Sequence, residues 1–203
     1  MKFRFYALWL SLICIILFIL QNMINGFTEL FVLNQNSYMQ IWRVVTAIFL
    51  HGGLSHLVYN LFALILFGTL LEKLIGGRNF LLTFFLAGIG ANIISVFFYP
   101  SSLGASGAIF GIIGTLIIVR PLLIVFAFGI PMPIIVAGIL WVGGDVMGIF
   151  FPSGVGNIAH LTGMFLGLLI GAFLRDWRKQ QKRKDHLRVD EGYMRHWEDH
   201  YMK

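Results

Sequence analysis

Six apolar segments constrain the fold of this chain more than any other feature of its sequence. They cover about residues 5–20, 54–71, 80–98, 106–119, 133–150 and 158–174. Charged residues are nearly absent before Arg175, and they make up only 12% of the 203 residues. A soluble domain collects its apolar residues around one core, whereas separate apolar segments of this kind are typical of transmembrane helices. The sequence therefore predicts an all-α, polytopic membrane protein with six spans.

The first segment follows a basic start, Met1-Lys2-Phe3-Arg4, which is also typical of a secretory signal peptide. No small-x-small cleavage site follows, and further apolar segments do, so we interpret it as a retained helix. The fourth and sixth segments are shorter than the ~20 residues of a straight span. They would need flanking residues or a locally thinned bilayer.

The basic residues predict the orientation of the bundle. With six spans and an intracellular N-terminus, every Lys and Arg except Arg43 falls on the cytoplasmic side. We therefore expect a plasma-membrane protein with both termini in the cytoplasm, and a basic cytoplasmic tail at residues 175–203. Nine of the 15 Lys and Arg residues lie in this tail, which carries +3 of the formal net charge of +6, so the basic excess indicates membrane topology rather than nucleic-acid binding.

Residues 22–51 form a long connection that mixes polar residues with aromatic ones. Trp42 and Arg43 favour the lipid headgroup layer, so we expect this connection to lie in the outer interface. A substrate-facing or bilayer-distorting role is the alternative.

Ser106 lies among small residues, in Gly104-Ala105-Ser106-Gly107-Ala108, where the fourth segment begins. At the N-terminal end of a helix, free backbone N–H groups and the helix dipole stabilise an oxyanion. Small neighbours also permit close helix packing. Taken alone, Ser106 is therefore either a candidate nucleophile or a packing residue.

His56 and Asn60 are four residues apart in the second segment, so they lie on one face of a helix. Polar side chains inside a membrane are costly. The pair is therefore either functional or satisfied by a polar contact between helices. His51 lies nearer the water, and we interpret it as structural.

His160 opens the sixth segment, and Gly163, Gly167 and Gly171 follow it on the same helix face. This row of glycines predicts that the face of His160 packs tightly against a neighbouring helix. Such packing favours a catalytic role for His160 over a place in the core.

The three segments with these polar residues all enter the membrane from the outer side in the predicted topology. His56, Asn60, Ser106 and His160 fall near their outer ends, so the four side chains can meet at a similar depth. A serine beside a histidine is a nucleophile with its general base.

Together the motifs resemble the rhomboid intramembrane serine proteases. The resemblance covers about residues 5–174 and rests on four motifs: Gly104-Ala105-Ser106-Gly107-Ala108, His56-Leu57-Val58-Tyr59-Asn60, Ala159-His160-Leu161-Thr162-Gly163 and the pair Trp42-Arg43. It implies that residues 1–174 form a six-helix rhomboid domain. It also implies Ser106 as nucleophile, His160 as general base and acid, and His56 with Asn60 as oxyanion donors. Glu72 matches a family position that structures a helix end.

Asp145, in the fifth segment, is the type of residue that orients the histidine of a soluble serine protease. Because the resemblance implies a dyad, we interpret Asp145 as structural. His196 and His200 are four residues apart in the tail, but no third ligand is evident, so we expect no metal site.

The resulting hypothesis is an intramembrane serine endopeptidase that cleaves transmembrane segments of other proteins. It needs no metal and no organic cofactor, and its expected partners are transmembrane substrates and the lipid bilayer. The alternative is a catalytically silent rhomboid-like protein that binds or escorts client transmembrane helices. Chemistry at Ser106 separates the two hypotheses.

Overall fold

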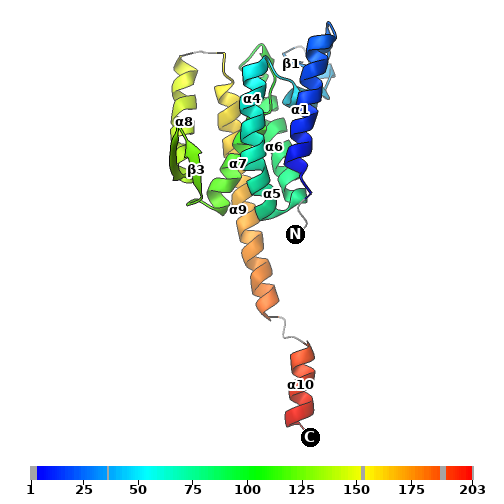
Figure 1. The fold of residues 1–203 in the computed structure, drawn as a ribbon, viewed down its shortest axis with the longest axis vertical. Coiled ribbons are helices and arrows are strands. Elements are labelled where there is room, and N and C mark those ends of the chain that lie inside the picture. Colours follow the sequence, from blue (N-terminus) through cyan, green and yellow to red (C-terminus); the bar gives the residue numbers. More distant parts are fainter. Residues whose placement is uncertain (1–3, 36, 152–153, 188–190, 203) are drawn as a thin grey trace.

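The computed structural model describes residues 4–35, 37–151, 154–187 and 191–202, without the side chains of Tyr38 and residues 176–194. The chain is mainly helical (Figure 1). Its α-helices are α1 (Tyr6–Met23), α2 (Phe27–Phe31), α3 (Arg43–Thr46), α4 (Leu54–Ala63), α5 (Thr69–Ile75), α6 (Gly77–Ser95), α7 (Ser106–Val119), α8 (Ile134–Phe150), α9 (Asn157–Leu187) and α10 (Glu191–Tyr201). A π-helical segment, η3 (Leu64–Gly68), joins α4 to α5, and two 3₁₀ turns, η1 (Ser37–Met39) and η2 (Ala47–Phe49), lie in the connection after α2.

Four of the helical segments are long and apolar enough to cross a membrane: Tyr6–Met23, Leu54–Ile75, Gly77–Ser95 and Asn157–Arg175. The second of these runs through α4, η3 and α5 as one rod. Two shorter apolar helices, α7 with 14 residues and α8 with 17, coincide with the other two predicted segments. The helices thus lie where the hydropathy of the sequence predicts them, and four of the six predicted spans have the length of a full membrane crossing.

Two small sheets correct the prediction of an all-α fold. Strands β3 (Ile124–Ala127) and β4 (Ile130–Pro133) pair antiparallel, with Ile124 opposite Pro133. The two residues between them, Phe128 and Gly129, have φ angles of 54° and 80°, and positive φ at both positions defines the type I′ hairpin turn. Strands β1 (Leu33–Asn34) and β2 (Ser101–Ser102) also pair, which ties the outer connection to the loop before α7.

The core of the bundle is the contact between α7 and α9, with α6 packed on both. An added Cβ on Gly163 would collide with the carbonyl of Gly107, and one on Gly167 would collide with the carbonyl of Gly111. The two backbones therefore touch directly, as small residues permit in membrane helices. This confirms the tight packing that the glycine row predicts.

Arg43 corrects the expectation for the outer connection. Its side chain is only 9% exposed, and its guanidinium Nη1 donates a hydrogen bond to the carbonyl oxygen of Val32 at 2.8 Å. Trp42, in contrast, is half exposed, as an interfacial tryptophan would be. Arg43 thus makes a buried contact within the connection itself instead of reaching the headgroups.

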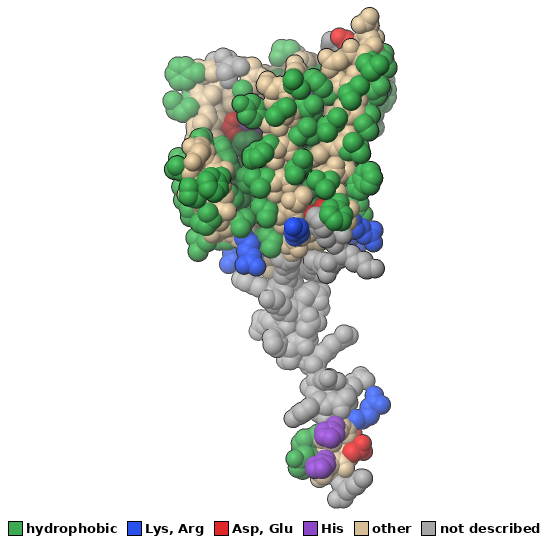
Figure 2. Space-filling view, in the orientation of Figure 1, with side chains coloured by type: hydrophobic (Ala, Val, Ile, Leu, Met, Phe, Trp, Pro, Cys, Tyr) green, Lys and Arg blue, Asp and Glu red, His purple; other side chains and the backbone are tan. Residues whose placement is uncertain are grey.

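The surface of the bundle is apolar. Figure 2 shows hydrophobic side chains over most of its visible face, with Lys and Arg gathered at the lower rim. Helix α1 begins at this rim, and α9 leaves the bundle there and continues to Leu187 (Figure 1). The two ends of the membrane bundle therefore share one side. Most basic side chains on which the predicted tail depends, in residues 176–194, lie outside the described residues.

Candidate active site

The four candidate site residues line one cavity of about 1170 Å³. Ser106 is the first residue of α7, His160 lies in the first turn of α9, and His56 and Asn60 lie on α4. The sequence predicts that these groups meet, and the cavity brings all four to its wall. In the described part of the chain no hydrogen bond joins Ser106 to His160; such contacts are often long before a substrate binds.

Gly104 brings the loop before Ser106 close to His56. Its φ of +120° suits a glycine, and an added Cβ would lie 2.7 Å from Cε1 of the His56 ring. The backbone N–H of Gly104 donates to the carbonyl of Ala47 at 2.9 Å, which fixes this loop. A side chain at this position would therefore displace the imidazole of His56.

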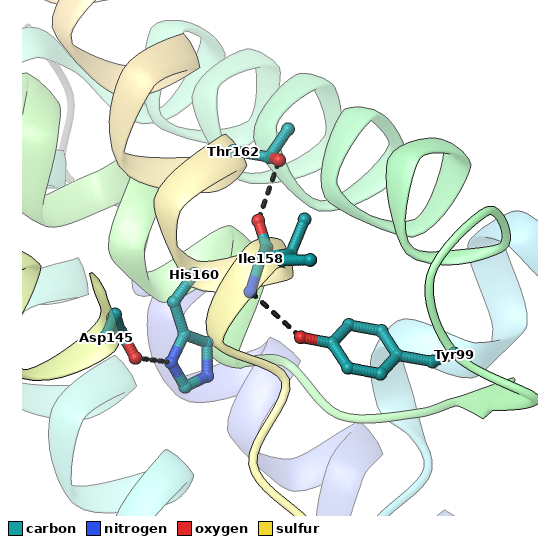
Figure 3. A network of polar contacts seen from close by, with 5 residues as sticks. All are labelled: Tyr99, Asp145, Ile158, His160 and Thr162. Carbon is teal, nitrogen blue, oxygen red and sulfur yellow. Dashed lines mark hydrogen bonds and ion pairs between the residues drawn. The ribbon is translucent and has the colours of Figure 1, made fainter. Parts of the chain in front are cut away.

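Two contacts fix the imidazole ring of His160, one at its edge and one on its face. Its Nδ1 lies 3.0 Å from Oδ1 of Asp145 (Figure 3). A carboxylate only accepts hydrogen bonds, so Nδ1 is the donor, and in the neutral imidazole Nε2 keeps a free lone pair. The ring of Phe110 stacks parallel on the imidazole, with centroids 4.3 Å apart and planes 5° apart. Phe110 lies one turn after Ser106 on α7, so the same helix carries the serine and the ring that packs on the histidine.

His56 has the opposite tautomer. The backbone N–H of Gly52 donates to its Nδ1 at 3.4 Å, so the proton is on Nε2, the atom next to Gly104. Asn60 uses one of its two amide N–H groups on the carbonyl of His56 at 2.8 Å. Each side chain therefore keeps one N–H that is able to donate to an oxygen in the cavity.

Comparison with known proteins gives the family. Residues 38–177, more than half of the chain, match the Rhomboid domain. The chain belongs to the rhomboid family. Rhomboid protease GluP of Bacillus subtilis (strain 168) is 40% identical over 139 residues, which are 66% of this chain and 26% of GluP. YdcA, another rhomboid-family protein of that organism, is 33% identical over 157 residues, 70% of each chain.

A third relative, RHOMBOID-like protein 6 of Arabidopsis thaliana, mitochondrial, is 33% identical over 135 residues, 66% of this chain and 43% of its own length. This rhomboid therefore spans only a quarter of the length of GluP and less than half of the Arabidopsis protein. The family match and the apolar helices together show that this is an integral, multi-pass membrane protein. Its family includes proteases.

Tyr99 is a residue of the rhomboid cavity that the sequence analysis missed. Its hydroxyl oxygen accepts a hydrogen bond from the backbone N–H of Ile158 at 3.0 Å (Figure 3). The first N–H groups of a helix have no partner within the helix, so Tyr99 caps α9 two residues before His160. The only signal in the sequence was a tyrosine before Pro100 at the end of an apolar segment.

His51 lies beside the cavity and agrees with its interpretation as structural. It is 2% exposed, its Nδ1 donates to the carbonyl of Phe49 at 3.2 Å, and its backbone N–H donates to Oε1 of Gln21 at 3.0 Å. Burial, and then the charge that His56 would carry, lower the pKa of His51 from 6.5 to about 4. His51 is therefore a neutral link between α1 and the start of α4.

Proposed function

We propose that this rhomboid is an intramembrane serine endopeptidase in which Ser106 and His160 form a catalytic dyad. The observation that carries the proposal is the hydrogen bond from His160 Nδ1 to Asp145, which leaves Nε2 as a proton acceptor in the cavity that Ser106 lines. A neutral imidazole with a free lone pair is the form that a general base requires.

The reaction follows from these groups. Nε2 of His160 accepts the hydroxyl proton of Ser106 while Oγ forms a bond to the peptide carbonyl carbon, and the carbonyl electron pair moves to oxygen. The tetrahedral intermediate collapses, the carbon–nitrogen bond breaks, and Nε2 gives its proton to the leaving amine. Water then enters, loses a proton to the same nitrogen and attacks the acyl carbon; the bond from that carbon to Oγ breaks, and Nε2 returns the proton to Oγ of Ser106.

The negative oxygen of the intermediate needs donors. The free N–H groups of His56 Nε2 and Asn60 Nδ2 support this role, together with the backbone N–H groups at the start of α7. All are part of the folded protein before substrate arrives, so they need little rearrangement as charge develops.

The substrates in this proposal are transmembrane segments of other proteins. The apolar surface of the bundle supports a site reached within the bilayer. Residues 1–174 are then the membrane domain, and residues 175–203 form a cytoplasmic tail of a plasma-membrane protein with both termini inside. The shared side of the two bundle ends supports this topology.

A tagged fluorophosphonate tests the proposal without a known substrate. We expect it to label the purified protein, and to label neither Ser106→Ala nor His160→Ala. Ser101→Ala is the matched control, because Ser101 is an exposed serine that lines the same cavity. Labelling of Ser106→Ala equal to that of the wild type would contradict the proposal.

The same variants address the alternative of a client-binding protein. Folded wild type that stays unlabelled, beside a rhomboid protease that labels under the same conditions, would favour client binding. Cleavage of a tagged transmembrane segment in proteoliposomes, lost in Ser106→Ala, would exclude a purely binding role.

A further inference from the structure

Asp145 is the buried charged residue of α8. The other sixteen residues of this 17-residue helix are uncharged, and Asp145 is 7% exposed. Its Oδ1 accepts the hydrogen bond from His160 at 3.0 Å, and its Oδ2 is buried without a hydrogen-bond partner in the part of the chain that the structure describes. A carboxylate with a purely structural role would be expected to have donors on both oxygens.

We propose that Asp145 is a positioning residue for His160, so that the proposed dyad works with the support of a third side chain. This inference rests on the proposed function. It revises the structural role that the family resemblance implied, because the one hydrogen-bond partner of the carboxylate among the described residues is the imidazole of the proposed general base.

The chemistry of the contact has two parts. As an acceptor, the carboxylate keeps the proton of neutral His160 on Nδ1 and turns the lone pair of Nε2 to the cavity. When Nε2 takes the proton of Ser106, the imidazole becomes positively charged, and the nearby carboxylate stabilises that charge. Asp145 accepts no proton in either step.

The competing explanation is that Asp145 only stabilises the packing of α8 against α9. In the outer half of α8, residues 142–150, only Asp145 is buried. A second contact joins the same two helices: an added Cβ on Gly148 would lie 2.5 Å from Nδ2 of Asn157. Gly148→Ala therefore disturbs the packing of α8 on α9 without touching the imidazole, and it is a matched control.

The first measurement is kinetic, with the full chain in proteoliposomes. In Asp145→Asn the amide can donate to Nδ1 and so favours the wrong tautomer; we expect kcat and the rate of fluorophosphonate labelling to fall about 10²-fold or more. KM and Tm should stay near wild type, and Asp145→Glu should recover part of the rate. Gly148→Ala should change Tm more than kcat.

A kcat of Asp145→Asn within twofold of wild type would overturn the inference. The inference would also be overturned if kcat fell in step with Tm in all three variants, Asp145→Asn, Asp145→Glu and Gly148→Ala. A purely structural contact between α8 and α9 predicts that result.

The second measurement does not depend on activity. In protein with ¹⁵N-labelled histidine, the His160 signals are assigned by their loss in His160→Ala, and their shifts tell which ring nitrogen carries the proton. We expect Nδ1–H in the wild type and Nε2–H in Asp145→Asn. An Nδ1–H signal in a protein that no fluorophosphonate labels would reject the proposed protease and keep the positioning contact, whereas Nε2–H in the wild type would reject the contact.

Discussion

The helices α7 and α8 lie next to each other in the sequence, yet the bundle holds them in different ways. Nine of the 14 residues of α7 are buried, against four of the 17 residues of α8. In Figure 1, α8 stands at the side of the bundle with the β3–β4 hairpin against it, whereas α7 lies within the bundle. The proposed nucleophile and base thus belong to α7 and α9, the most closely packed pair, while Asp145 reaches the base from a helix with little burial.

The difference has a physical cause. Close contact between α7 and α9 fixes their relative position through backbone atoms, which do not change rotamer. The outer half of α8 depends on the polar contacts of Asp145 and on packing at Gly148. We therefore expect substitutions at the contact of α7 with α9 to affect folding, and substitution of Asp145 in α8 to affect chiefly the site.

The largest effect is expected where the backbones touch. Gly167→Ala places a methyl group against the carbonyl of Gly111 and should lower the free energy of unfolding by about 3 kcal/mol. Gly143→Ala, on α8, is the matched control, since an added Cβ there meets no atom within 4 Å. Thermal unfolding in detergent measures both, and equal loss in the two variants would contradict the contrast between α7 and α8.

The next effect concerns the cavity wall formed by α4. If His56 and Asn60 donate to the oxyanion, His56→Ala and Asn60→Ala should each lower kcat by about 10²-fold, with smaller changes in KM. Ser55→Ala is the control, because Ser55 lines the same cavity on the same helix. Cleavage of a transmembrane reporter gives both constants. A rise in KM with unchanged kcat would assign these residues to substrate binding instead.

His51 gives a pH-dependent effect at the junction of α1 and α4. Its pKa is about 4 in the folded protein and 6.5 in the unfolded chain, so below pH 6.5 the unfolded state binds the extra proton. Stability should therefore be constant above that pH and fall as the pH drops from 6.5 to 4, by about 2 kcal/mol at pH 5.

The slope of Tm against pH in this range tests the role of His51. His51→Gln should start from a lower Tm at pH 7.5 and show a flatter slope. Parallel curves for the two proteins would mean that another group causes the loss at low pH.

The smallest effect is expected at the opposite end of the bundle. Glu72 is buried, and its two oxygens accept the backbone N–H groups of Arg4 and Ala7 at 3.0 and 3.2 Å. Glu72→Gln replaces one acceptor by an amide N–H and should cost about 1.5 kcal/mol. Fluorophosphonate labelling below the unfolding temperature should stay at the wild-type rate, because Glu72 does not line the cavity. Slower labelling would show that the two ends of the bundle are coupled.

The helices could be predicted from the sequence because hydropathy is a local property. The fourth predicted segment, residues 106–119, has the bounds of α7, and the fifth begins one residue before α8. The glycine row after His160 predicted a tight helix contact for the same reason: its spacing puts the residues on one face whatever the partner is. The hairpin after α7 was missed, since its strands are apolar on both faces, and short apolar runs do not distinguish strand from helix.

The polar contacts could not be predicted, because each joins residues that no sequence period relates. Glu72 was expected to structure a helix end, and the structure shows that the end belongs to α1, 65 residues away. Arg43 was expected at the headgroups and is buried against Val32.

The sequence by itself determined that this protein is a bundle of apolar helices with a serine, two histidines and an asparagine near the ends of three of them. Apolar length and residue spacing suffice for that, because they act within one helix. Only the tertiary structure decided that Nδ1 of His160 faces the carboxylate of Asp145, and that Nδ1 of His56 faces the backbone N–H of Gly52. These properties depend on how one helix is rotated and placed against another, and a hydrogen bond forms or fails over less than an ångström.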